Sequence, residues 1–206
     1  MADHMWDLWM ERAKPLVPVI VIKDPDEAVP LARALVDGGV RMLEVTLRTE
    51  HGLGAIETIK QEVPEAIVGV GTVTSAQQML DALNKGAEFV VSPGSSDALL
   101  DCAKEWGGPY LPGVATPSDV MRAREAGFTY QKFFPAGVAG GIPMLKALSG
   151  PFGDVKFCPT GGIGQENYQD YLALSNVFAV GGSWLTPADL QSARNWQAIS
   201  SLAIAG

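Results

Sequence analysis

The chain has 206 residues, of which 47% are apolar and 18% charged, and its formal net charge at pH 7 is −8. This length suits one sizeable core, so a single domain spanning residues 1–206 is expected. The acidic balance, without any basic cluster, argues against nucleic acid or an anionic membrane as a partner. It leaves a small acidic substrate open, because local donors can bind an anion on an acidic protein.

Cysteine and histidine are scarce. Cys102 and Cys158 do not make a disulfide framework or a zinc site, and His4 and His51 lack ligand spacing. We therefore expect no structural metal and a reducing compartment. No apolar run approaches the length of a membrane span, and the N-terminus is acidic where a signal peptide would be basic. A cytoplasmic protein is expected.

The chain begins with a short amphipathic pattern and continues as an alternation of strands and helices. Residues 3–13 place Trp6, Trp9 and Met10 on one helical face, and we expect this helix to cap one end of the core. Strands are expected at 17–21, 42–46, 67–70, 89–91, 109–111, 130–134, 155–158 and 177–180. Helices are expected at 26–36, 50–61, 75–84, 96–106, 117–126, 141–148, 166–174 and from 187 onward.

Eight strand–helix units in succession imply a parallel sheet with right-handed crossovers. Eight units favour an α/β fold of the closed (β/α)8 TIM-barrel type, with the first helix as an N-terminal cap. The alternative is an open, doubly wound sheet.

The unusual residues gather where the expected strands end, which is where a barrel of this type carries its chemistry. They are Glu44, Thr46, Arg48, Gly71, Thr72, Ser92, Pro93, Gly94, Pro112, Gly113, Lys132, Thr160, Gly161, Gly162, Gly181, Gly182 and Ser183.

Lys132 lies inside an aromatic, strand-like run. An ammonium group is costly to bury without a partner, and desolvation favours the neutral amine. A neutral lysine amine is a nucleophile that forms a Schiff base with a carbonyl substrate. The alternative is an edge-strand lysine that extends its charged head into water.

Alternation along the strands relates Lys132 to a carboxylate. Glu44 shares a face with Met42 and Thr46, and the opposite, fully apolar face should meet the helices. Glu44 is therefore expected to point inward. Lys132 shares a face with Phe134, and if that face is also inward, Lys132 and Glu44 enter the same space. The pair could be a buried structural ion pair, but at the active end of a barrel such a pair favours a functional role.

Two double glycines follow the seventh and eighth strands, the usual place for a phosphate site in a barrel. Gly161-Gly162 and Gly181-Gly182 allow the backbone to approach an anion, and Ser183 adds a hydroxyl donor. The alternative is that these glycines only make tight turns.

Arg48 and Thr72 are candidates for binding a carboxylate. A planar guanidinium suits bidentate recognition of this group, although Arg48 could also be an exposed loop residue. Thr72 could be a helix N-cap, but Thr74 and Ser75 are better placed for that role.

Six segments together resemble one known family. They are residues 43–49 (LEVTLRT), 68–73 (VGVGTV), 92–94 (SPG), 132–136 (KFFPA), 157–163 (FCPTGGI) and 181–185 (GGSWL). In this order they resemble the 2-keto-3-deoxy-6-phosphogluconate (KDPG) aldolases, also called 4-hydroxy-2-oxoglutarate aldolases. The resemblance runs from about Pro15 to Pro187, nearly the whole chain.

The resemblance implies a class I aldolase that uses no metal or other cofactor and forms a homotrimer of small barrels. It would cleave the phosphorylated keto acid to pyruvate and glyceraldehyde 3-phosphate. By motif, Lys132 is the Schiff-base lysine and Glu44 the acid and base. The resemblance also implies that Arg48 and Thr72 bind the carboxylate of the pyruvyl part of the substrate. The double-glycine loops and Ser183 would bind the substrate's phosphate, and Pro93 and Thr160 would line the pocket near the bound carbonyl.

Two alternatives remain. One is a related enzyme on the same barrel, either a phosphogalactonate aldolase with the other C4 configuration or an enzyme preferring unphosphorylated 4-hydroxy-2-oxoglutarate. The other is a non-catalytic phosphosugar-binding barrel, because a fold alone does not fix function. Such a binder would need neither Lys132 nor Glu44.

Overall fold

A computed structural model describes residues 2–206. Its strands are β1 (Leu16–Ile20), β2 (Met42–Thr46), β3 (Ile67–Gly71), β4 (Phe89–Val91), β5 (Tyr110–Leu111), β6 (Gly113–Val114), β7 (Tyr130–Phe133), β8 (Lys156–Pro159) and β9 (Val180–Gly182). Its α-helices are α1 (Ala2–Met10), α2 (Ala28–Asp37), α3 (Gly52–Glu62), α4 (Ala76–Asn84), α5 (Asp97–Trp106), α6 (Pro117–Glu125), α7 (Gly141–Ser149), α8 (Tyr168–Leu172), α9 (Ala188–Ser192) and α10 (Trp196–Ala205), with a 3-10 turn η1 (Pro25–Glu27) before α2.

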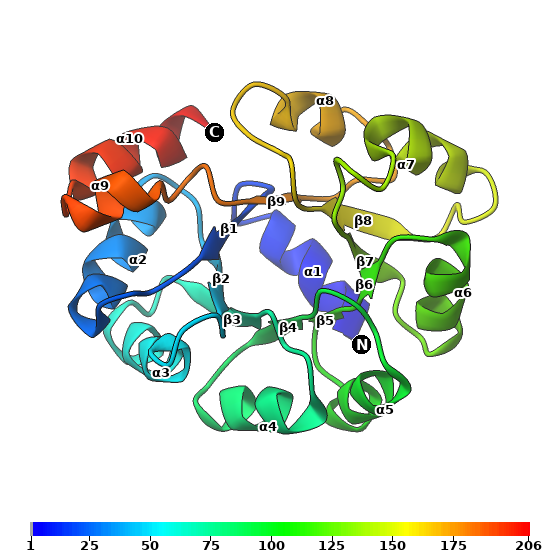
Figure 1. The fold of residues 1–206 in the computed structure, drawn as a ribbon, viewed down its shortest axis with the longest axis horizontal. Helices are drawn as coiled ribbons and strands as arrows, with labels where there is room; N and C mark the ends of the chain where they lie inside the picture. Colours follow the sequence, from blue (N-terminus) through cyan, green and yellow to red (C-terminus); the bar gives the residue numbers. More distant parts are fainter. Residues whose placement is uncertain (1) are drawn as a thin grey trace.

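The strands pair in parallel, as the alternation predicted. One sheet has the order β5-β4-β3-β2-β1-β9 and a second the order β6-β7-β8. Only Pro112 separates β5 from β6, and two isolated parallel bridges, Phe157–Val177 and Thr160–Gly181, lie between the β8 and β9 segments. Figure 1 shows the strands curling around the middle of the molecule with helices outside them. The α/β class and the curled parallel arrangement are confirmed.

The two faces of the strands bury different clusters, and this fixes which side chains point inward. Leu43 and Val45 of β2 belong to the larger apolar cluster, which the outer helices share. Met42 belongs to a smaller cluster with Phe89 and Tyr130. The predicted alternation along β2 is therefore correct, and Glu44 lies on the Met42 face.

Helix α1 packs against the smaller cluster. The Trp6 side chain is buried and its ring contacts Phe89, Tyr130 and Phe178 at centroid distances of 5.6, 6.3 and 5.9 Å. The Tyr130 hydroxyl donates a 2.5 Å hydrogen bond to Asp7. These contacts attach the helix to β4 and β7, and in Figure 1 it crosses the middle of the ring.

Several helix and strand boundaries predicted from the sequence differ from those in the structure, most of them near the C-terminus. The single helix expected from 187 onward is two helices, because Arg194 takes a left-handed φ of 51° and the Asn195 side chain accepts a bond from the Ala198 amide, starting α10 anew. The last strand is Val180–Gly182 rather than 177–180, and α8 covers only part of 166–174. The first helix ends at Met10, before Pro15.

None of the helices within residues 2–206 combines the length and apolarity needed to cross a membrane.

Candidate functional site

The centre of the site is an amine–carboxylate pair contributed by β7 and β2. Lys132 Nζ lies 3.2 Å from Glu44 Oε1, and the two side chains are only 6% and 3% exposed. Desolvating two charges is costly, so a buried pair is weak evidence of stabilisation. The predicted meeting of Lys132 and Glu44 inside the sheet is confirmed.

Gly71 makes room for the Glu44 carboxylate. A Cβ at this position would lie 2.2 Å from Glu44 Oε1 and 2.5 Å from its Cγ. Gly71 ends β3 and pairs with Thr46 in the β2–β3 register, so the glycine lies directly beside the strand that carries Glu44. Any side chain at Gly71 would displace the carboxylate, so only glycine at this position allows Glu44 its observed place.

Two further side chains surround the amine. The ring centroid of Phe134 lies 5.4 Å from Lys132 Nζ, within the range of a cation–π contact. Cys158 pairs with Lys132 in the β7–β8 register, and burial raises the pKa of its thiol to about 12. The thiol is therefore neutral near pH 7. Alternation had placed Phe134 on the Lys132 face, but only the structure shows its proximity to the amine.

Beside this pair lies a cleft of about 180 Å³. Its lining residues are Val19, Arg48, Phe134, Thr160, Gly161, Gly162, Ile163, Gly182 and Ser183. Gly161 and Gly162 have φ values of 96° and 73°, a left-handed conformation that glycine adopts readily. The predicted anion-binding candidates Arg48 and Ser183 meet here, and Phe134 connects the cleft to Lys132.

Three predicted site residues lie close by without lining this cleft. Gly181 gives room to Thr160, whose Oγ1 would lie 2.2 Å from a Cβ at that glycine. The Pro93 backbone packs on Gly113, the register partner of Lys132.

Thr72 is the third of these residues, and it follows Gly71 directly. It has a left-handed φ of 62°, which is strained for a β-branched residue. Ser75 accepts a bond from the Gln78 amide, so Ser75 is the N-cap of α4 and Thr72 is not, as predicted. Sequence reasoning did not identify Val19 and Ile163 as lining residues; apolar side chains at strand ends carry no signal that separates cleft from core.

The fold and the site define a class of protein. It is a parallel α/β protein whose sheet holds a buried amine against a carboxylate, next to a glycine-rich cleft with one guanidinium and two hydroxyls. This set can supply an amine nucleophile, a proton carrier and donors for an anion.

The chain belongs to the KDPG and KHG aldolase family, whose sequence model matches residues 9–202. The 2-dehydro-3-deoxy-phosphogluconate aldolase of Pseudoalteromonas atlantica is 51% identical over 189 residues, covering 92% of this chain and 88% of the relative.

Two solved structures are also similar. One is a KDPG aldolase from Legionella pneumophila with pyruvate captured as a covalent carbinolamine intermediate, with a TM-score of 0.92, 47% identity and coverage of 95% of both chains. The other is the Zymomonas mobilis ZM4 aldolase with 3-phosphoglycerate, with a TM-score of 0.89, 44% identity and coverage of 96% of this chain and 94% of the other.

Proposed function

We propose that the protein is a class I aldolase that cleaves 2-dehydro-3-deoxy-6-phosphogluconate to pyruvate and glyceraldehyde 3-phosphate, and that it also accepts 4-hydroxy-2-oxoglutarate. The single observation that carries the proposal is the buried Lys132–Glu44 pair, 3.2 Å apart, beside the glycine-rich cleft. Membership of the family and the pyruvate adduct of the Legionella pneumophila relative support it.

The reaction begins at Lys132. Its unprotonated amine attacks the C2 carbonyl of the keto acid, and a proton transferred to the carbonyl oxygen gives a carbinolamine. Loss of water then gives an iminium ion, with Glu44 supplying the proton that the leaving hydroxyl needs. The pair is suited to this step because the carboxylate is within hydrogen-bond reach of the amine.

Cleavage follows from the positive charge on the iminium nitrogen. Glu44, directly or through a water, removes the proton of the C4 hydroxyl, and the C3–C4 bond breaks as its electrons move toward nitrogen. The aldehyde leaves and an enamine remains on Lys132. Protonation at C3 and hydrolysis of the imine release pyruvate and restore the amine.

The substrate's two anionic ends need separate partners. In the proposal, Arg48 and Thr72 bind the carboxylate, while the phosphate lies on the backbone of the two double-glycine loops and on the Ser183 hydroxyl. Pro93 and Thr160 flank the carbonyl. The cleft geometry supports these assignments for Arg48, Thr160 and Ser183, which all line it.

We propose that the curled sheet is a closed (β/α)8 barrel in one domain, with α1 as its N-terminal plug. The two bridges at β9, the short Pro112 gap and the aromatic contacts of Trp6 support this. By the family resemblance we also propose a homotrimer. The free cysteines Cys102 and Cys158 suit a cytoplasmic enzyme.

The proposal is tested by following pyruvate release from the purified protein with three substrates: the phosphogluconate-derived keto acid, its phosphogalactonate epimer and 4-hydroxy-2-oxoglutarate. We expect the highest kcat/KM for the first, and loss of all three activities in Lys132→Met. Highest activity on the epimer would transfer the assignment to the galactonate series. Tight substrate binding without any turnover would identify a non-catalytic binding barrel.

A further inference from the structure

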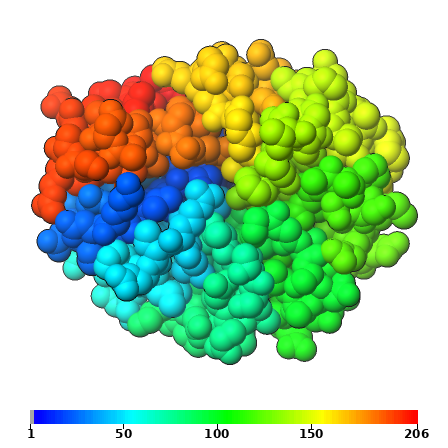
Figure 2. Space-filling model, in the orientation of Figure 1, coloured from blue at the N-terminus to red at the C-terminus, as the bar shows by residue number. Residues whose placement is uncertain are grey.

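A second pocket adjoins the cleft, and apart from Ser183 none of the residues that line it has a role in the proposed reaction. It has a volume of about 330 Å³ and lies between the segment after β1 and the start of α9. Val19 and Ser183 line both cavities, so the pocket and the cleft lie on either side of these two residues. In Figure 2 the orange surface near α9 lies against the blue surface of the early chain.

Three polar side chains that line the pocket are largely buried. Glu27, Thr186 and Gln191 line it and are only 8%, 4% and 8% exposed. Within the part of the chain that the structure describes, the Thr186 hydroxyl has no hydrogen-bond partner. Gln191 Nε2 donates a 2.7 Å bond to the Thr186 carbonyl, which fixes the orientation of its amide.

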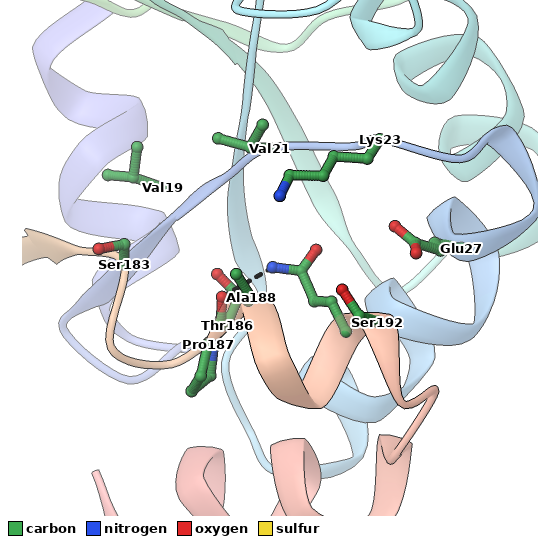
Figure 3. Close-up of a pocket in the computed structure, with 10 residues that line it drawn as sticks. Val19, Val21, Lys23, Glu27, Ser183, Thr186, Pro187, Ala188 and Ser192 are labelled. Carbon is green, nitrogen blue, oxygen red and sulfur yellow. Dashed lines mark hydrogen bonds between the residues drawn. The ribbon is translucent and has the colours of Figure 1, made fainter.

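Glu27 is the most informative of these residues. Among the described residues 2–206, no hydrogen bond and no ion pair reaches its carboxylate. Its carboxylate opens onto the pocket, so a ligand with hydroxyl groups can replace water as its hydrogen-bond partner. Figure 3 shows the Glu27 carboxylate and the Lys23 amine both pointing toward the middle of the pocket, where they do not pair with each other.

We propose that this pocket is a second binding site, for a small hydroxylated phosphate monoester. Lys23 and Ser183 bind the phosphate, and Glu27 and Gln191 bind the hydroxyl groups. The proposal rests on the proposed function only in that Ser183 is shared with the cleft.

Charge determines how such a ligand is oriented. A phosphate dianion is attracted to the exposed Lys23 ammonium and repelled by Glu27, while a carboxylate accepts strong hydrogen bonds from hydroxyl groups. A ligand with a phosphate and hydroxyl groups therefore places its phosphate at Lys23 and its hydroxyl groups at Glu27. Because Ser183 serves both cavities, an occupant should compete with the phosphorylated keto acid and should compete less with unphosphorylated 4-hydroxy-2-oxoglutarate.

The test is titration calorimetry of the full chain with glycerol 3-phosphate, which has neither a carbonyl for Lys132 nor a carboxylate for Arg48. Inorganic phosphate is titrated in parallel. We expect glycerol 3-phosphate to bind more tightly than phosphate, and Lys23→Met to weaken its binding at least about tenfold, as for loss of a charge-assisted hydrogen bond. Lys146→Met, which removes an exposed lysine of α7, is the matched control and should bind like the unchanged protein.

Glu27→Gln separates hydroxyl recognition from anion recognition. It should lower the preference for glycerol 3-phosphate over phosphate, while phosphate binding is kept or improved. Equal affinity for the two probes, or unchanged affinity in Lys23→Met, would show an anion in the glycine-rich cleft only and would overturn the proposal. Binding is measured here without turnover, and the Schiff base is tested separately by trapping with pyruvate, so failures of the two proposals are distinguishable.

Discussion

Adding one methyl group at Gly71 should separate the Lys132–Glu44 pair. In Gly71→Ala the new Cβ would lie 2.2 Å from Glu44 Oε1. Since C···O contacts need more than about 3 Å, the carboxylate must move by about 1 Å. Its present distance from Lys132 Nζ is 3.2 Å, so a shift of this size removes it from hydrogen-bond reach in most directions.

A misplacement of 1 Å can cost about 100-fold in rate, and we expect kcat for cleavage to fall by about this factor. The amine of Lys132 remains, so borohydride should still trap a pyruvate adduct, formed more slowly. Steady-state kinetics and intact mass spectrometry measure the two effects. Overpacking typically costs about 1–3 kcal/mol, so a urea midpoint is needed to confirm that the variant is folded.

Gly54→Ala in α3 is the matched control, because no atom of residues 2–206 lies within 4 Å of a Cβ there. It should keep full activity and gain slightly in helix stability. The reasoning is wrong if folded Gly71→Ala retains a kcat within about threefold of Gly54→Ala, a difference too small for a displaced catalytic group.

Three further outcomes are expected. Phe134→Leu removes the ring beside Lys132 and should lower the rate of pyruvate adduct formation more than it changes the urea midpoint; an unchanged rate would deny the ring a role at the amine. Because burial raises the pKa of Cys158 to about 12, iodoacetamide at pH 8 should label this thiol only after unfolding. Peptide mass spectrometry that found Cys158 labelled in the native protein would contradict this. Burial opposes ionisation of Asp119, but hydrogen bonds from Thr116 and the Ala115 amide hold the pKa of Asp119 below its usual value. Its stabilisation is therefore present above about pH 4 and lost as pH falls, so the difference in urea midpoint between Asp119→Asn and the unchanged protein should shrink at pH 3; a constant difference would contradict this.

The central pair could be found from the sequence because two strong physical constraints acted on few residues. Alternation along β2 allowed only one inward direction for Glu44, and Lys132 was the lysine among the unusual residues at the strand ends that could meet it there. The double glycines could be singled out because they follow two consecutive strands, where they either make tight turns or let the backbone approach an anion. Regular spacing of strands and helices was sufficient for the α/β class.

Other features depended on contacts that no local pattern records. The role of Gly71 requires knowledge of which side chain lies across the strand pair, and the Lys23–Glu27 pocket joins segments near opposite ends of the chain. The break between α9 and α10 depends on a left-handed Arg194, a residue type that gives no warning of that conformation.

The central claim is that Lys132 forms a Schiff base, and borohydride reduction in the presence of pyruvate tests it most directly. Peptide mass spectrometry should find the reduced adduct on Lys132 and on no other lysine, and the Lys132→Met variant should remain unmodified. A folded protein that yields no adduct, or one that carries it on a different lysine, would contradict the account.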